Sequence, residues 1–526
     1  MVVCFFMDAL KIMTRTGDSC TEHKWLILLL SIVVQASISL SGYSGFNMPP
    51  KFGDFEAQRH WMEITTNLPI SEWYVNSTNN DLNYWGLDYP PLTAYHSFIV
   101  GKISEMIHPE WTALHTSRGI TNDYHKLFMR MSVMVTFVAL YIPALWLLLK
   151  NAKSEVLLAA LLYPGLMLID NGHFQYNHIS LGLFLWAVYF FFKNKPAYGS
   201  VAFVLALSFK QMELYHAIPI FAYLLGRSLF YGPLTLRPIK SIIYHLAKLG
   251  ICVIITFAVV WAPFVYSKDG PLQVLGRIFP FYRGLFEDKV ANFWCCSSVV
   301  FKFKDLLTIH QLLRASTGLV LLSVIPTFFT LLLNPSKTCF LMGLLNSSLS
   351  FFLFSFQVHE KSILLAAIPA LLLLQEERLL MTTLLSVTNI SLFPLLLKDG
   401  VVSALPYSIA YHCVFQNNVS IKSLLSNFSF AAGCLLCVAE MIVPPPAHLP
   451  FLFPLLNAIY SFAHFILLKL YLDYKMTSSL VNIFRGTNTK KDRTEQLSRK
   501  AKTEMEKRNA KTKDGESTGI RQRTRR

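Results

Sequence analysis

The sequence predicts an all-α polytopic membrane protein, and three observations lead to that fold class. Of the 526 residues, 53% are hydrophobic and only 15% are charged, whereas soluble globular chains carry about 25% charged residues. Phe alone accounts for 41 residues. About fourteen apolar segments follow one another along the chain, and several are long enough to cross a bilayer. A soluble multidomain protein is therefore excluded, because so few charges cannot cover its surface.

The apolar segments are expected to form about fourteen transmembrane helices. Three of them, near 197–208, 362–374 and 402–415, are short enough to be re-entrant or broken helices, so the count is good to about two. The other predicted spans are 25–42, 127–149, 156–170, 178–192, 212–230, 243–266, 314–333, 339–355, 380–397, 425–442 and 451–472.

The distribution of charge predicts the orientation of these spans. Loops rich in Lys and Arg tend to stay in the cytoplasm, and such loops follow most of the even-numbered spans. The stretch 475–526 carries 16 Lys and Arg against 6 Asp and Glu, whereas the loop 43–96 has a net charge of −4. We therefore expect a cytosolic N-terminal segment (1–24) and a disordered, basic cytosolic tail (473–526) near anionic lipid, with no role in nucleic-acid binding.

Between these ends, residues 25–472 are expected to form one transmembrane domain with two large loops on the opposite side, 43–126 and 267–313. Every polar cluster of interest follows an odd-numbered span, so separate loops are expected to assemble one site at one membrane surface. The first loop also contains the sequon Asn76-Ser77-Thr78, which makes Asn76 an accessible glycan acceptor on that side.

Several short runs carry the residue types that a catalytic site needs. The run GDFEAQRHW (53–61) holds two acids, Asp54 and Glu56, which do not share a helical face because they are two positions apart. One acid is therefore free for a site while the other takes a structural partner. In YWGLDYPPL (84–92), Asp88 lies in an aromatic turn, which suits either sugar binding or the bilayer interface.

Three further runs complete the pattern: IDNGHFQYN (169–177), FEDKVANFW (286–294) and FQVHEK (356–361). Each also has a plain structural interpretation. Polar groups gather at the ends of spans, and charged loop residues form salt bridges that need not touch a substrate.

Together, these five ordered motifs resemble the endoplasmic-reticulum dolichyl-phosphate-glucose-dependent α-1,3-glucosyltransferases, from about residue 43 through the final spans. The resemblance implies the GT-C glycosyltransferase fold in the endoplasmic-reticulum membrane, with a lumenal active site and both termini in the cytosol. It further implies an inverting transfer of glucose from dolichyl-phosphate glucose to Man9GlcNAc2-PP-dolichol. The first and fourth motifs favour the branch that adds the first glucose.

The family resemblance assigns the base to Asp54, and the chemistry of the donor suggests the other roles. A phosphate leaves as a stable anion and needs no proton, so one base plus cationic donors would suffice. The candidates that face the donor phosphate are His359, Lys361, Arg283 and Lys289. Candidates for sugar or acceptor binding, or for support of the loops, are Glu56, Arg59, His60, Trp61, Asp88, Asp170, His173, Gln175, Asp288 and Asn292.

No metal or other cofactor is expected, because the sequence has no DxD-type carboxylate pair and the donor is a monophosphate. No obligate protein partner is indicated. Three alternatives stay open: the sister transferase that adds the second α-1,3-linked glucose, a lipid or solute transporter, and a noncatalytic scaffold. A transporter is disfavoured because the motif charges collect at one surface instead of along a path through the membrane.

Overall fold

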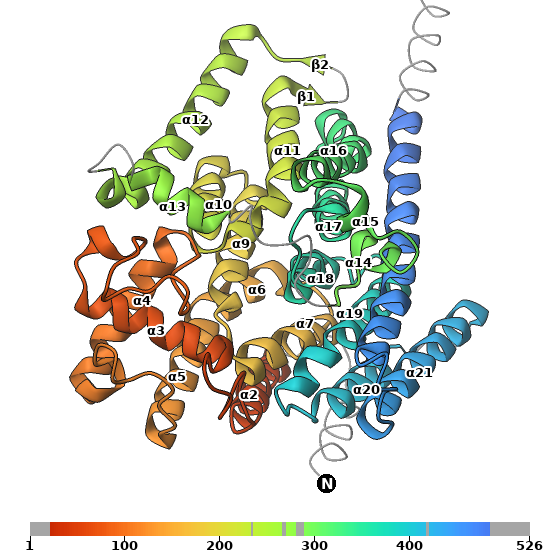
Figure 1. Cartoon of the computed structure of the whole chain (residues 1–526). Coiled ribbons are helices and arrows are strands. Elements are labelled where there is room, and N and C mark those ends of the chain that lie inside the picture. The colour runs from red at the N-terminus through yellow and green to blue at the C-terminus, as the bar shows by residue number, and fades with distance from the viewer. Residues whose placement is uncertain (1–20, 233–234, 266–269, 280–288, 417–419, 484–526) are drawn as a thin grey trace, which may run out of the picture.

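A computed structural model describes residues 21–232, 235–265, 270–279, 289–416 and 420–483, and most of these residues lie in helices (Figure 1). Within the described residues, the strands are limited to one antiparallel hairpin, formed by β1 (Phe230–Gly232) and β2 (Thr235–Leu236). Its register places Phe230 opposite Leu236. The predicted helical architecture is confirmed for this part of the chain.

The N-terminal half alternates long helices with short turns. Its elements are α2 (Thr21–Ile38), α3 (Gly53–Asn67), η1 (Ile70–Glu72), α4 (Pro91–Ile107), η2 (Pro109–Thr112), α5 (Asp123–Thr136), η3 (Phe137–Tyr141), α6 (Ile142–Leu149), α7 (Ser154–Leu161), α8 (Pro164–Met167), η4 (Leu168–Phe174), α9 (Asn177–Phe192), α10 (Pro196–Phe209), η5 (Gln211–His216) and α11 (Ala217–Leu229). Two of these segments, η3 and η4, are π-helical and widen longer helices.

The C-terminal half follows the hairpin. Its elements are α12 (Ile239–Trp261), η6 (Ala262–Phe264), α13 (Gly270–Ile278), α14 (Phe293–Ser297), α15 (Phe303–Leu306), α16 (Ile309–Leu333), α17 (Lys337–Phe354), η7 (Glu360–Ile363), α18 (Leu364–Leu372), α19 (Arg378–Lys398), α20 (Ala404–Phe415), α21 (Ile421–Ile442) and a terminal helix, Leu452–Ile483. Side chains of the preceding residues cap several starts, as Thr308 does for α16 in a reciprocal pair with Gln311.

Eight helices among the described residues are long and apolar enough to cross a membrane, so the chain is a multi-pass membrane protein. They are Asp123–Leu149, Ser154–Phe174, Ile239–Phe264, Ile309–Leu333, Lys337–Phe354, Arg378–Lys398, Ile421–Ile442 and Leu452–Ile483. The other six predicted spans form shorter helices: α2, α9, α10, α11, α18 and α20. Fourteen full spans are therefore not confirmed, because most of these helices fall short of the roughly 30 Å hydrocarbon core.

Burial sorts the long helices into a centre and a periphery. The apolar window of Ser154–Phe174 is entirely buried inside the protein, whereas that of Ile239–Phe264 has no buried residues. In Figure 1, α12 stands at one edge of the molecule and α21 at the opposite edge. Apolar side chains on these outer helices suit contact with lipid, while the central helices bury their side chains against one another.

The basic turns gather at one end of the helices. The Lys24 ammonium donates to the carbonyl oxygen of Lys150 over 2.6 Å, which joins α2 to the turn after α6. Similarly, Arg378 at the start of α19 donates to Glu155 at the start of α7 over 2.6 Å. Contacts between elements so distant in sequence show that the N-terminal segment and the ends of the second and tenth predicted spans lie together, as the charge distribution predicts.

The predicted start of the disordered tail, residue 473, is wrong. The terminal helix continues to Ile483, and Met476 is buried in it with only 2% exposure. Lys469 and Asp473, one helical turn apart, form an ion pair at 2.6 Å, and Asp473 also accepts a hydrogen bond from Asn346 of α17. This packing against neighbouring helices extends the ordered chain beyond the apolar stretch; the remainder of the tail, 484–526, lies outside the described residues.

The loop predicted at 43–126 is itself mostly helical, with α3 and α4 side by side (Figure 1). It ends a few residues earlier than predicted, because α5 begins at Asp123. A separate aromatic core fixes α3 and α4 against η6 and α13, through Trp61, Trp73, Tyr74, Phe264 and Ile278. In the second predicted loop, 267–313, the described residues form α13, α14 and α15, and α16 already begins at Ile309.

Candidate active site

Asp54 lies in the first turn of α3, where the backbone geometry depends on glycine. Phe52 and Gly53 both have left-handed φ values, 57° and 68°. A Cβ atom on Gly53 would stand 2.6 Å from the side-chain oxygen of Ser44, so only glycine fits at this crossing. The same serine oxygen accepts the Asp54 backbone N–H at 3.1 Å, which fixes where the helix begins.

Ser44 also ties α3 to a second element of the site. Its backbone N–H donates to the carbonyl oxygen of His173 at 3.1 Å, at the end of η4. Next to Asp54, the buried ring of Phe55 stacks on Tyr43 at 4.0 Å and lies 4.8 Å from the ring of Phe174. The backbones that carry Asp54 and His173 are therefore held together by hydrogen bonds and by aromatic packing.

Three side chains from two distant parts of the chain converge on one oxygen of Asp54. His173 Nε2 lies 3.0 Å from Oδ2, and Gln175 donates its amide to the same atom at 2.7 Å. Lys361, in the first turn of η7, contacts Oδ2 through its ammonium group and lies 3.0 Å from His173 Nε2. Among the described residues, no hydrogen bond reaches Oδ1, and the Asp54 side chain is 25% exposed.

These contacts set the charges of Asp54 and Lys361. Burial opposes ionisation of Asp54, but the charges of Lys361 and His173 outweigh it and hold the pKa of the carboxyl well below its usual range. Burial likewise disfavours the charged form of Lys361, yet Asp54 beside it raises the pKa of the lysine. Asp54 is therefore a carboxylate near neutral pH.

A second lysine orients Gln175. Lys210, at the end of α10, donates to Gln175 Oε1 at 3.1 Å and to Asn177 Oδ1 at 2.7 Å. Because a cation faces one end of the Gln175 amide and a carboxylate the other, the NH2 group must point at Asp54. Asn177 in turn donates to Asp170 at 2.6 Å. This polar chain positions a neutral donor on the base.

On the other side of His173 lies Asp399, directly after α19. Its carboxylate accepts a hydrogen bond from His173 Nδ1, and its side chain is only 5% exposed. Arg130 of α5 joins the backbone after α2 to that of η4 by donating to the carbonyl oxygens of Gly42 and Gly172, at 2.9 and 2.8 Å. Five separate segments of the chain thus meet around Asp54, which is the convergence of loops that the charge pattern predicts.

The other acid of the first motif points elsewhere. Glu56 pairs with Arg59 at 2.6 Å and accepts a hydrogen bond from Tyr84 at 2.9 Å. Arg59 also pairs with Glu63 at 2.6 Å, and His60 lies 3.1 Å from the same carboxylate. Arg59, His60 and Glu63 are completely buried, so this cluster braces α3 internally.

Comparison with known proteins identifies the family. Residues 23–471, well over half of the chain, match the ALG6, ALG8 glycosyltransferase family. The chain belongs to this family. The resemblance indicated by the five motifs is thereby confirmed, and the match includes every residue of the Asp54 cluster.

Relatives of similar length include proteins from three animal species. One from Caenorhabditis elegans, named "Probable dolichyl pyrophosphate Man9GlcNAc2 alpha-1,3-glucosyltransferase", is 45% identical over 451 residues, or 85% of this chain and 88% of the relative. The Gallus gallus "Dolichyl pyrophosphate Man9GlcNAc2 alpha-1,3-glucosyltransferase" is 43% identical and covers 86% of this chain and 96% of its own length. A Drosophila melanogaster relative with the "Probable" form of the name is 44% identical, covering 86% of this chain and 97% of the relative.

Other predicted residues of this family member make contacts within and next to the first loop. Trp61 donates from its indole to the Trp85 carbonyl at 2.8 Å, and the backbone carbonyl of Asp88 accepts a hydrogen bond from Gln211 of η5 at 3.3 Å. Asn292 is buried and caps α14 through a 2.8 Å hydrogen bond from the Cys295 backbone.

The predicted phosphate-binding cations of the described residues come from two segments of the chain. Lys289 places its ammonium 5.7 Å from the centre of the Phe451 ring, whereas His359 lies two residues before Lys361, at the start of η7. Arg283 and Asp288 lie outside the described residues. Asn76 is exposed, as a glycan acceptor must be.

Sequence reasoning missed Asp399 and gave Lys210 no role. Both follow odd-numbered predicted spans, so the charge pattern already placed them at the same surface as Asp54. A charged residue beside glycine at the end of a span, as in Lys398-Asp399-Gly400, is the signal that would have drawn attention to the first. Nothing in the sequence indicates which histidine it contacts.

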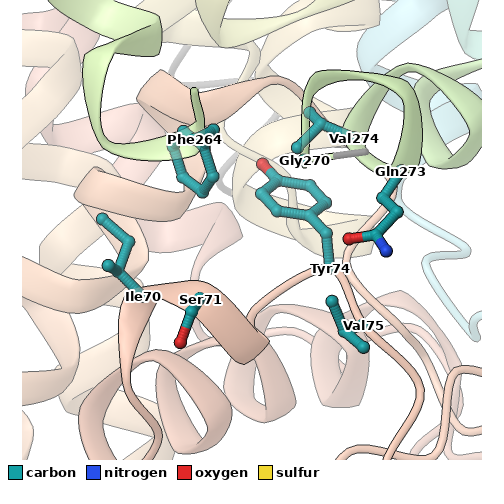
Figure 2. A pocket seen from close by; sticks show the side chains of 8 residues that line it. All are labelled: Ile70, Ser71, Tyr74, Val75, Phe264, Gly270, Gln273 and Val274. Atoms are coloured by element: carbon teal, nitrogen blue, oxygen red, sulfur yellow. The ribbon is translucent and has the colours of Figure 1, made fainter. Parts of the chain in front are cut away.

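A small surface hollow lies outside the cluster. Tyr74 lines it together with Phe264 and Gln273, between the loop after η1 and the start of α13 (Figure 2). Its volume of about 10 Å3 has room for no more than one water molecule. Within the described residues, no group of three or more His, Cys, Asp or Glu side chains is placed to hold a metal ion.

Proposed function

We propose that this protein transfers glucose from dolichyl-phosphate glucose to Man9GlcNAc2-PP-dolichol, forming an α-1,3 linkage with inversion at the sugar. The observation that carries the proposal is one partly exposed carboxylate, Asp54, held ionised through one oxygen in a chain 43–45% identical to proteins named for this acceptor. The relatives' names specify Man9GlcNAc2, which supports addition of the first glucose.

Asp54 suits the role of general base. Three donors fix Oδ2, so the carboxylate is oriented without side-chain freedom, while Oδ1 receives no hydrogen bond from the described residues. An acceptor hydroxyl bound at Oδ1 would pass its proton to Asp54 as it attacks the glucose carbon. A low pKa makes this base weak but keeps it ionised, which suits proton transfer late in an oxocarbenium-like reaction.

The leaving group needs positive charge and no acid. As the bond to glucose breaks, the dolichyl phosphate gathers negative charge that nearby cations stabilise. Lys361 contacts the base directly, and its flexible four-carbon stem also allows it to reach a phosphate oxygen bound beside Asp54. The further candidates are His359, on the same short segment as Lys361, and Arg283 and Lys289, which precede α14 in the sequence.

We further propose that the protein resides in the endoplasmic-reticulum membrane with the Asp54 cluster in the lumen and both termini in the cytosol. The support is the positive charge of the turns at the opposite end and of the stretch 475–526, which holds 16 Lys and Arg and 6 Asp and Glu. A glycan on the exposed Asn76 would require the same orientation. Loss of an endoglycosidase-sensitive mobility shift in Asn76→Gln tests this; a wild-type protein without any shift would contradict it.

The decisive experiment uses purified full-length protein in detergent with synthetic dolichyl-phosphate glucose and a Man9GlcNAc2 lipid acceptor. We expect one glucose to be transferred, in an α-1,3 linkage, with activity that survives chelation of metals. An acceptor that already carries one glucose tests the sister activity. Preferential transfer to that acceptor would replace the proposal with second-glucose addition, and flux without transfer in proteoliposomes would replace it with transport.

A further inference from the structure

Asp399 is a buried charge that the reaction described above does not use. It directly follows α19, where Gly400 turns the chain with a left-handed φ of 72° and Val401 N–H donates back to the Leu396 carbonyl at 2.9 Å. This tight turn holds the carboxylate in one place, with its side chain 5% exposed and its oxygen on His173 Nδ1.

We propose that Asp399 is a positioning residue for the transfer reaction, which acts through His173 on the base Asp54. The inference rests on the proposed function. Asp399 does not need to touch a substrate, because the imidazole ring spans the distance between the two carboxylates.

The hydrogen bonds of the His173 ring support this positioning role of Asp399. A carboxylate only accepts hydrogen bonds, so the one that Asp399 forms keeps a proton on His173 Nδ1. The other nitrogen, Nε2, then faces Asp54 Oδ2 at 3.0 Å and Lys361 Nζ at 3.0 Å. The proton on Nε2 is therefore the only one on the ring that can differ between two states of the site.

The arrangement has a consequence for the base. A carboxylate behind an imidazole fixes the ring's tautomer and orientation and stabilises its protonated form. Protonated His173 donates to Asp54 and adds to the positive charge that holds it ionised, while neutral His173 leaves that task to Lys361. Asp399 thus controls how firmly Asp54 is held as a carboxylate.

Other charged groups face the row formed by Asp399, His173 and Asp54, and they must stay unchanged in a test. They come from every charged element packed around it: Asp54 of α3, Arg130 of α5, Asp170 of η4, Lys210 after α10, and Glu360 and Lys361 of η7. None of these residues is itself replaced in Asp399→Asn, but the charge of Asp399 also favours the protonated form of Lys361. A shift of the pH profile therefore reports on Asp399 acting through His173 and, more weakly, through Lys361.

The test is the pH dependence of kcat for wild type and Asp399→Asn, using the full-length protein and the two lipid substrates. Asp54 must be ionised to act, so its titration sets the acidic limb. With Asp399 neutral, His173 contributes less positive charge, the pKa of Asp54 rises, and the limb moves to higher pH by about one unit. We also expect kcat at its optimum to fall by about tenfold or more.

Two further variants separate positioning from mere support. Asp399→Glu retains the carboxylate and should keep the limb near that of wild type even if kcat falls. Glu155→Gln, the same type of change in the ion pair at the opposite end of the helices, should leave the profile unchanged.

Each outcome decides the inference. A wild-type profile for Asp399→Asn would overturn it, and so would lower activity with an unshifted limb, since that shows only structural support. If Asp399→Asn does not fold, a limb displaced by a unit in Asp399→Glu overturns it, and an unshifted limb supports it. Failure of the wild type to transfer glucose would instead refute the proposed function.

Discussion

Helix α3 carries two charged clusters within three turns, and they are built in opposite ways. The first, around Asp54, draws its partners from η4, η7 and the segment after η4, more than a hundred residues away. The second, around Arg59, takes both its carboxylates from the same helix, three and four residues away. Long-range charges surround the first residue, whereas local ones surround the second.

The exposure of the two clusters differs accordingly. Asp54 and Lys361 are 25% and 22% exposed, while Arg59 and Glu63 are fully buried. Glu63 also accepts the His115 backbone N–H at 2.8 Å, so one of its oxygens fixes a neighbouring loop. A closed cluster of buried, paired charges stabilises a fold, whereas an open carboxylate with one oxygen unoccupied by the described residues can receive a substrate.

The largest expected effect is the loss of the base. Asp54→Asn removes the proton acceptor but keeps the shape and two of the polar contacts, so kcat should fall by about a hundredfold or more. The assay is glucose transfer between the two lipid substrates at saturating concentrations. The thermal-unfolding midpoint should stay near that of wild type; a folded Asp54→Asn protein that retains full activity would break the contrast between the two clusters.

The converse change affects folding more than chemistry. Glu63→Gln leaves part of the Arg59 charge unpaired in a buried site, which should destabilise the protein by about 3 kcal/mol. Its thermal-unfolding midpoint in detergent should fall, while the activity per folded molecule persists. Glu105→Gln is the matched control, because Glu105 pairs with Lys102 at the surface and should change stability by less than about 0.5 kcal/mol.

Glu63 also predicts a pH dependence. Burial alone would raise its pKa, but the hydrogen bond from His60 and the charge of Arg59 outweigh burial and lower the pKa to about 2. The pKa of Glu63 in the folded protein lies below its unfolded value of about 4.5. The contribution of Glu63 to the free energy of unfolding is therefore complete above pH 4.5 and disappears as pH falls toward 2. The midpoint of Glu63→Gln should therefore fall less over this window than that of wild type.

A change in Lys361 sharpens the comparison by altering the base without removing it. In Lys361→Met the nearest positive charge is gone, so the pKa of Asp54 should rise and the acidic limb of kcat should move upward by about 1–3 pH units. If Lys361 also binds the donor phosphate, KM for dolichyl-phosphate glucose rises as well. Lys102→Met is the control; an unshifted limb in Lys361→Met would show that this contact does not set the charge of Asp54.

The smallest effect is expected from the neutral donor. Gln175→Leu removes the 2.7 Å hydrogen bond to Asp54 and leaves both neighbouring charges in place. A hydrogen bond to a charged group contributes about 1.5 kcal/mol, so kcat should fall by about tenfold and the acidic limb should move upward by no more than about one pH unit. A loss as large as that of Asp54→Asn would mean that Gln175 contacts the reacting groups itself.

Much of the fold was predictable, because burial in lipid demands long apolar helices that any reader of the sequence can find. The residues at which the helices begin and end were harder to predict. The segment 362–374 forms only the nine residues of α18 after η7, because it is enclosed by other helices and does not need to span the bilayer. The end of the terminal helix was missed because Met476 and Asp473 gain their partners from α16 and α17, which no local pattern reveals.

The candidate site was predictable in its parts and not in its assembly. The motif around Asp54, the polar turn with His173 and Gln175, and the segment with Lys361 all stood out, since charged residues at the ends of apolar spans are costly and informative. Their direct contacts could not be predicted, because they depend on which helices are neighbours. The sequence singled out Asn292 but not its contact, in which the side-chain oxygen caps α14.

By itself, the sequence determined that the chain is helical, lies in a membrane, and carries its motif charges at one surface. These properties follow from composition and from short-range spacing, which depend on solvent and on the helical repeat alone. Only the tertiary structure decided that Asp54 contacts His173 and Lys361, and that Asp399 stands behind His173. Those choices depend on contacts between residues more than a hundred positions apart, where packing selects one partner among many.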